Sequence, residues 1–200
     1  MVVYAYDAEF LEHGPTRPIS LISIGIVASD GRELYLQYCY ADWATIQHLE
    51  DPWLKENVLP YLDHFNMEQV CPDWGAILDE RRGGHFTTPW RTREQMRLAI
   101  FEFMNPDVHG PIEKMVGYFP SYDHVVFCQI FGRMIDLPKG FKQWTWCLKQ
   151  WASDHGIEYL GRHVPHDPTL DGPEHRAISD ARWTMRAYQW AMAQTGVPNG

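Results

Sequence analysis

The chain has 200 residues, of which 45% are hydrophobic and 22% charged, as expected for a globular protein that buries a sizeable core. Its formal net charge of -9 argues against a broad basic groove that would hold a long nucleic acid. The four cysteines show no paired spacing, which predicts free thiols in a reducing compartment rather than a disulfide framework. Residues Met1-Val2-Val3 lack the basic region that is typical of a signal peptide, and no apolar run approaches the roughly 18 residues of a membrane span. We therefore expect a cytoplasmic protein without a membrane partner, with one domain over residues 1–194 and a flexible tail over 195–200.

The first predicted strand begins at residue 2 and ends in two acids, Asp7 and Glu9, that are separated by one residue. Side chains two positions apart on a strand point to the same face, so the two carboxylates lie side by side. Because like charges repel, a divalent cation is the simplest reason for a fold to keep them together. A strand end with two hydrated carboxylates explains the pair equally well, and the pair alone leaves both interpretations open.

Two further strands follow. Residues 12–18 contain Gly and two Pro and predict a loop, whereas 19–28 alternate in a way that indicates a strand with at least one buried face. The Asp30-Gly31 pair is a strong turn signal, and residues 33–40 form the return strand. These strands predict an antiparallel meander at the start of the domain.

The middle of the chain is less regular. Residues 52–62 predict a short helix that Pro60 breaks, and residues 63–89 are rich in Gly, Pro and His. Within them, residues 81–84 predict an exposed loop. Residues 92–95 form a capping-box pattern that opens a helix with one apolar face, which Asn105-Pro106 ends.

The C-terminal half alternates strands and helices. Residues 112–119 predict a strand, Ser121 caps a helix to about residue 131, and Thr145 caps another to about residue 155. The last helix spans about 173–193. Three strands followed by this alternation indicate an α/β or α+β architecture with a mixed sheet.

Two downstream segments can complete the acid pair. Asp123 lies in the first turn of a predicted helix, where a plain helix-start acid is also favourable. His175 and Asp180 are five residues apart, which separates them by about 140° on a regular helix. They meet only if His175 lies at or before the helix start, and Pro173 favours such a start. An ordinary helix start explains this pair too.

Taken together, Asp7-x-Glu9, Asp123 and His175-x4-Asp180 resemble, in that order, the DEDD exonucleases of the histidine subtype. The similarity extends over about residues 2–190 and is strongest to a compact bacterial branch of 3'-5' exoribonucleases. It rests on the stretches YDAEFLEHG, ISLISIGIVASDGRELY, WRTREQMR, YDHVVFCQ and HRAISDAR. The resemblance implies a ribonuclease H-like fold, with a mixed five-stranded sheet that starts with three antiparallel strands and is flanked by helices.

The resemblance also implies a mechanism. Asp7 bridges two divalent cations, Glu9 and Asp180 complete one of them, and Asp123 supports the other directly or through water. An all-oxygen site suits Mg²⁺ or Mn²⁺, and His175 serves as the general base. The expected reaction releases nucleoside 5'-monophosphates from the 3' end of single-stranded RNA or RNA overhangs, gripped near that end. A homodimer is expected as well.

The segment after the first acids departs from the family pattern. Phe10 and Leu11 follow Glu9 where many members have Thr and Gly, and the Asn common before the family's middle Asp is missing. Ala8, Phe10 and Leu11 are the candidates for contact with the terminal nucleotide. Three further side chains are candidates for contact with substrate or a second subunit, and equally for ordinary packing: Trp90, Arg91 and Arg93.

Three alternatives remain at this point. A zinc hydrolase site at His163 and His166, with His155 nearby, is disfavoured because Pro165 breaks any helix that would align the pair. A non-catalytic nucleic-acid-binding module on the same fold is disfavoured by the intact acids. An exonuclease acting on DNA or on short oligonucleotides stays open, because no sequence feature identifies a contact to the 2'-hydroxyl.

Overall fold

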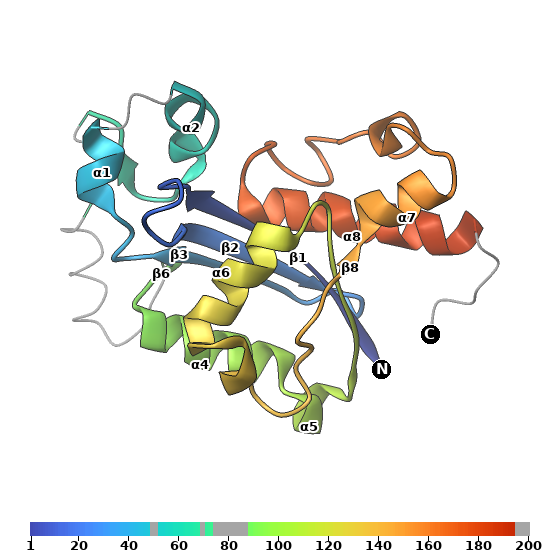
Figure 1. Ribbon diagram of the computed structural model, residues 1–200. Helices are drawn as coiled ribbons and strands as arrows, with labels where there is room; N and C mark the ends of the chain where they lie inside the picture. The colour runs from blue at the N-terminus through green and yellow to red at the C-terminus, as the bar shows by residue number, and fades with distance from the viewer. Residues whose placement is uncertain (49–51, 69–70, 74–87, 195–200) are drawn as a thin grey trace.

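The computed structural model describes residues 1–48, 52–68, 71–73 and 88–194. At its centre lies a mixed sheet of six strands in the order β6-β3-β2-β1-β7-β8 (Figure 1). The first three strands pair antiparallel, as predicted: β1 (Val2–Leu11), β2 (Ser20–Ala28) and β3 (Glu33–Tyr38). The others join in parallel: β7 (Ile112–Gly117) on β1, β8 (Trp146–Cys147) on β7 and β6 (Trp90–Arg91) on β3. The α/β class is confirmed.

The sheet has six strands rather than the expected five. Its outermost strands, β6 and β8, have two residues each, which is too short for any alternation pattern to show in the sequence. The predicted strands 33–40 and 112–119 each end two residues early. An additional ladder of β4 (Phe65–Asn66) and β5 (Cys71–Pro72) lies in the region expected to be irregular.

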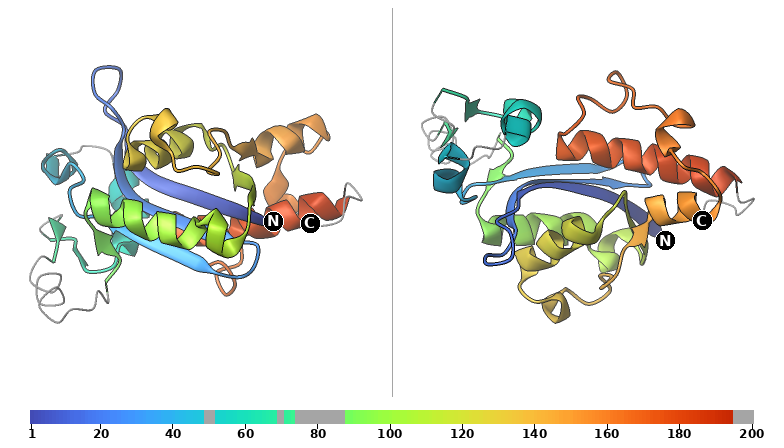
Figure 2. Two further views of the ribbon diagram at one scale, coloured as in Figure 1. Left: turned by 90° about the horizontal axis from the view of Figure 1, so that it is seen from below. Right: turned by 45° about the horizontal axis from the view of Figure 1, so that its top comes forward.

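Helices cover both faces of the sheet (Figure 1, Figure 2). Helix α8 (Ala177–Gln194) lies along one face, next to α7 (Leu148–Asp154), and α4 (Arg93–Met104) and α6 (Ser121–Phe131) cover the other. The remaining helical segments are short: α1 (Trp43–His48), α2 (Pro52–Asn57), η1 (Leu59–Tyr61), α5 (Pro106–His109), η2 (Met134–Asp136) and η3 (Leu160–Arg162). Among the described residues, no helix combines the length and apolar character that crossing a membrane requires.

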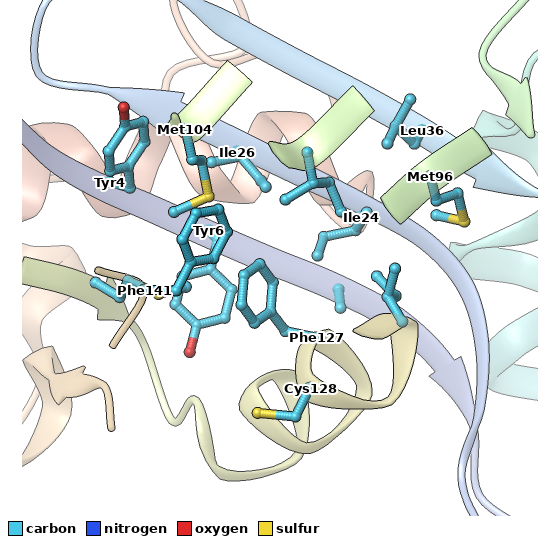
Figure 3. Close-up of a cluster of buried hydrophobic side chains, with 14 of the residues drawn as sticks. Tyr4, Tyr6, Ile24, Ile26, Leu36, Met96, Met104, Phe127, Cys128 and Phe141 are labelled. Atoms are coloured by element: carbon cyan, nitrogen blue, oxygen red, sulfur yellow. The ribbon is translucent and has the colours of Figure 1, made fainter. Parts of the chain in front are cut away.

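Strand β1 separates two cores. Tyr4 and Tyr6 point into the cluster under α4 and α6, which Figure 3 shows in close-up. The residues between them, Val3 and Ala5, pack with α7 and α8 on the opposite face. Because side chains alternate along a strand, Asp7 continues the α8 face. The two acids therefore point to the same side of the sheet as the last helix.

Three helix starts differ from the sequence prediction. Ser121 is the first residue of α6 and not its cap, because Phe119, at φ 57°, turns the chain and accepts a hydrogen bond from the Ser121 amide at 2.8 Å. Thr145 does not cap α7, because its hydroxyl donates to a carbonyl of β7, and Cys147 takes that place. Helix α8 begins at Ala177 rather than at residue 173.

Other local predictions had mixed outcomes. The capping box of α4 is confirmed, since the Thr92 side chain accepts from Gln95 and the Gln95 side chain accepts from the Thr92 amide. In the predicted helix 52–62, α2 ends at Asn57 and Pro60 lies in the 3-10 turn η1. Helix α1 was not predicted. The expected loop 81–84 and the tail 195–200 lie outside the described residues.

Candidate active site

Asp7 and Glu9 form a cluster with Asp180, although the first two come from β1 and the third from α8. Each carboxylate offers an oxygen, and the three oxygens lie within 4.8 Å of one another. Glu9 is only 9% exposed, and β1 continues for two residues beyond it. Burial of Glu9 argues against a hydrated strand end, and the structure brings the carboxylates of Asp7, Glu9 and Asp180 together.

A glycine on β2 allows α8 to come this close to the sheet. Gly25 pairs with Asp7 across the β1–β2 ladder. A Cβ at this glycine would lie 2.4 Å from the Cα and the amide nitrogen of Ile178 in the first turn of α8. Without a side chain in between, the backbone of the helix rests directly on the strand. This contact carries Asp180 to the acids of β1.

His175 lies two residues before α8, as the sequence argument requires. It is one of three non-glycine residues with a positive φ among the described residues, at 60°, which is a strained conformation. Its amide donates to Oδ2 of Asp180 at 2.9 Å. Its imidazole packs edge-on against the indole of Trp53 in α2, with ring centroids 5.0 Å apart. Among the described side chains, the imidazole has no hydrogen-bond partner and is available to a ligand.

Asp123 completes the set from the first turn of α6. The entry to this helix is tight, since a Cβ at Gly117 would lie 2.4 Å from the Pro120 side chain. The Asp123 carboxylate is buried, and its Oδ1 accepts a hydrogen bond from the Ala8 amide at 2.8 Å. Asp123 thus lies beside Asp7 but is not one of the three carboxylates with mutually close oxygens.

The four acids are electrostatically unbalanced. Burial, together with repulsion from neighbouring acids, raises the pKa values of Asp7 and Glu9 well above their usual range. Burial raises the pKa of Asp123 to about 6, and burial with nearby Glu174 raises that of Asp180 to about 7. Nowhere in the described chain does a Lys or Arg form an ion pair with these acids. An oxygen-only donor set with excess negative charge fits a hard divalent cation such as Mg²⁺ or Mn²⁺.

Two hollows flank the carboxylates. The Glu9-side hollow, about 300 Å³, is lined by residues 8–12 together with Trp53 and Leu54. The Asp7-side hollow, about 470 Å³, touches the acids and extends away from them along aromatic side chains. The acids lie where the two hollows approach each other. The residues that line the Asp7-side hollow are Asp7, Tyr118, Tyr159, Gly161, Pro165, His166, Glu174, His175, Asp180, Trp183 and Thr184.

Comparison with known protein families shows to which family the chain belongs. The family described as the 3'-5' exoribonuclease Rv2179c-like domain matches residues 3–192. The chain belongs to this family. It is 34% identical over 186 residues to the 3'-5' exoribonuclease Rv2179c of Mycobacterium tuberculosis strain H37Rv, a match that covers 93% of this chain and 90% of that protein. The 3'-5' exoribonuclease MT2234.1 of strain CDC 1551 gives the same identity and coverage.

In this Rv2179c-like domain, the predicted substrate contacts Ala8, Phe10 and Leu11 all line the Glu9-side hollow. The Phe10 ring packs edge-on against Tyr122, with centroids 5.9 Å apart. Sequence analysis missed Trp53, which lines the same hollow and is 49% exposed. The sequence did offer a signal for this residue: Trp53 follows Pro52 at the start of a short helix, in a chain that is rich in Trp.

Other predicted contacts of this Rv2179c-like domain lie elsewhere. Trp90 is fully buried in a third core cluster, and the Arg93 guanidinium donates to the carbonyl of Ile130, so neither faces the acids. Arg91 donates to backbone carbonyls of its own segment. These three residues pack; they do not line either hollow.

The zinc alternative fails on geometry. The ring of His163 stacks on Trp190 with centroids 5.1 Å apart, and the ring of His155 stacks on Trp151 at 4.4 Å. His166 lies instead near Glu174 on the wall of the Asp7-side hollow. The one cluster with metal-ligand geometry in the described part of the chain is the acidic one.

Proposed function

We propose that this chain is a metal-dependent 3'-5' exoribonuclease of the DEDD class, histidine subtype, built as one domain over residues 1–194 on a ribonuclease H-like fold. Its family membership supports a 3'-5' exoribonuclease activity. The observation that carries the proposal is the meeting of Asp7, Glu9, Asp123 and Asp180 with His175, because three distant chain segments contribute to it. A mixed α/β sheet flanked by helices is compatible with the proposed fold.

The acids provide the binding site for the cations. Asp7, Glu9 and Asp180 hold divalent cations, and Asp123 supports them from the side of Ala8. When bound, the cations neutralise charge on the phosphate, activate water and stabilise the leaving oxygen. The raised pKa values of the unpaired acids support this role, because a site built for cations is unfavourable for negative charge without them.

His175 accepts the proton of the attacking water. Its imidazole lines the Asp7-side hollow beside the acids, and its backbone is tied to Asp180. Trp53 packs against the ring and limits the orientations that it can adopt. A positioned base of this kind typically contributes about 10²–10⁴-fold to the rate.

The Glu9-side hollow receives the 3'-terminal nucleotide. Ala8, Phe10 and Leu11 line this hollow together with Trp53. The net charge of -9 favours a substrate gripped near its end over a long duplex in a basic groove. The product is the nucleoside 5'-monophosphate. The family resemblance supports RNA as the substrate and a homodimer as the assembly, and light scattering of the purified protein measures the latter.

The decisive experiment follows the shortening of 3'-labelled single-stranded RNA by the purified protein with Mn²⁺, beside a DNA oligonucleotide of the same sequence. Asp7→Ala should abolish the activity. Glu94→Ala, which removes an exposed acid on α4, should leave the activity unchanged and serves as the matched control.

Each other outcome has a defined meaning. If the wild-type protein degrades neither RNA nor DNA with any divalent cation, the nuclease assignment fails and a binding module is favoured. If DNA is degraded as fast as RNA, the nuclease assignment stands and the preference for RNA is wrong.

A further inference from the structure

The proposed reaction assigns the Glu9-side hollow to the terminal nucleotide and uses the Asp7-side hollow only at its acidic end, so the rest of this second hollow has no role yet. This second hollow is the larger of the two, at about 470 Å³ against about 300 Å³. It begins at Asp7, Asp180 and His175, where the scissile phosphate must lie, and leads away between the start of α8 and the segment after α7. The part of the substrate that is joined to the 5' side of that phosphate must extend away from the carboxylates, and this hollow provides space for it.

The far wall of the hollow is aromatic and fixed. The indole of Trp183 on α8 donates to the Val164 carbonyl at 2.8 Å, which sets the plane of the ring. Tyr118, directly after β7, packs edge-on against that indole with centroids 5.0 Å apart. Phe119 in turn packs edge-on against Tyr118, at 4.9 Å. The rings brace one another and hold their positions without a ligand.

Tyr159 contributes the exposed part of this wall. Its side chain is 58% exposed, although it lies against the chain at Gly161. A Cβ at Gly161 would come within 2.8 Å of the Tyr159 ring and hydroxyl, so the glycine leaves the space that the ring occupies. The hydroxyl lies close enough to Tyr118 to help burial raise the pKa of that phenol. A large ring held open to solvent beside fixed aromatic side chains is suited to stacking.

The charges of the lining select among possible ligands. The hollow contains Glu174 and the acids of the active site but no Lys or Arg among its described lining residues. The part of a ligand that contacts this lining is therefore uncharged. An uncharged, flat, aromatic group matches both the rings and the absence of basic side chains, and nucleobases of any sequence stack on aromatic rings.

Building on the proposed function, we propose that the Asp7-side hollow is the subsite for the nucleoside on the 5' side of the scissile phosphate, with its base stacked on Tyr159 and Tyr118. The terminal nucleotide occupies the Glu9-side hollow, and the phosphate between them lies at the carboxylates. Because any base can stack on an aromatic ring, this subsite contributes binding affinity without selecting a sequence.

A double-mutant cycle between the protein and the substrate tests this subsite. The substrates are the 5'-phosphorylated dinucleotide pApU and the same molecule with an abasic ribose in place of the adenosine. Removal of the base keeps the leaving oxygen and the phosphate. The proteins are the wild type, Tyr159→Ala and Tyr159→Phe, assayed with Mn²⁺. Stacking contributes about 5- to 150-fold per base.

We expect Tyr159→Ala to lower kcat/KM for pApU by about tenfold, mainly through KM. The abasic substrate should lower the wild-type value by a similar factor, and Tyr159→Ala should lose little more on it. Tyr159→Phe, which keeps the ring, should behave as the wild type. Gly161→Ala, which displaces the Tyr159 ring, should lower kcat/KM for the same substrate as Tyr159→Ala does, but by a smaller factor.

Tyr40→Ala serves as the matched control, because Tyr40 is an equally exposed tyrosine outside both hollows and should change neither substrate. Equal losses on both substrates, or no loss on pApU, would overturn the subsite while the nuclease activity stands. A wild-type protein that cleaves no RNA at all refutes the proposed function instead, so the two failures are distinguishable.

Discussion

Two buried carboxylate sites adjoin α8 and are built in opposite ways. Asp171 is fully buried, and Nε of Arg186 donates to its Oδ1 at 2.8 Å. Burial alone would raise the pKa of Asp171, but the guanidinium outweighs it and holds the pKa below its usual value. At the first turn of the same helix, Asp180 has no cationic partner among the described residues, and burial raises its pKa to about 7. The chain supplies one acid with a cationic partner of its own, whereas the other acid has none among the described residues.

The two sites are also linked in the chain. Asp171 accepts a hydrogen bond from the Asp167 amide, and the carbonyl of Asp171 accepts one from Arg182 of α8. These bonds fasten the turn that leads into His175. The Asp171 carboxylate therefore has a structural role, because it stabilises the segment that precedes Asp180.

The largest expected effect breaks the structural site. Asp171→Asn leaves the Arg186 guanidinium without its counter-charge, and we expect it to lower the free energy of unfolding by about 3 kcal/mol. Urea unfolding followed by circular dichroism measures this loss. Asp154→Asn is the control, because this acid on α7 is exposed and accepts a hydrogen bond from the Gln150 side chain, and it should cost less than about 0.5 kcal/mol. A loss below about 1 kcal/mol for Asp171→Asn would contradict the comparison.

The second effect supplies the missing charge. Mn²⁺ at about 100 times its dissociation constant should stabilise the wild-type protein by about 2.7 kcal/mol, because the cation binds the folded acids alone. Thermal unfolding with and without EDTA measures the shift. Asp171→Asn should keep this response, whereas Asp7→Asn should lose most of it. An equal response in both variants would show that the cation binds elsewhere.

The third effect moves Asp180 without changing its charge. Gly25→Ala inserts a methyl group where the backbone of α8 lies 2.4 Å away, so the helix must shift from the strand. We expect a loss of about 1–3 kcal/mol in the free energy of unfolding, with a weaker stabilisation by Mn²⁺. Chemical denaturation with and without Mn²⁺ gives both values. Unchanged Mn²⁺ stabilisation would mean that the helix contact does not position the acid.

The smallest effect is a difference in pH dependence. The raised pKa values of Asp123, about 6, and Asp180, about 7, mean that the folded protein without cations binds more protons than the unfolded chain between about pH 4 and 7. Its stability should fall as the pH rises through this window. Asp171 has the opposite sign, because its lowered pKa gives stability that is lost as the pH falls below about 4.

Denaturation in EDTA at pH 5 and pH 8 measures this difference. Asp180→Asn should remove most of the fall in stability between the two values, since its side chain no longer titrates. A stability that rises from pH 5 to pH 8 in the metal-free wild type would contradict the assignment of the acids as unpaired.

Local patterns predicted much of the molecule correctly. The alternation of residues 19–28, the Asp30-Gly31 turn and the capping box at Thr92 depend on neighbours within a few positions, and the structure confirms all three. Most of the failures have another cause. Strands β6 and β8 and the start of α7 depend on contacts with distant segments, which no local window contains, whereas the start of α6 depends on an unexpected local turn at Phe119.

The sequence by itself determined that Asp7 and Glu9 share a face, through the two-residue period of a strand, and that His175 can meet Asp180 only ahead of a helix. Tertiary structure alone decided that these groups meet. The bare backbone at Gly25, the indole of Trp53 against His175 and the two hollows arise from packing between segments far apart in the chain. The face on which a side chain lies follows from its neighbours in the sequence, whereas the distance between two segments far apart in the chain depends on the packing of the whole core.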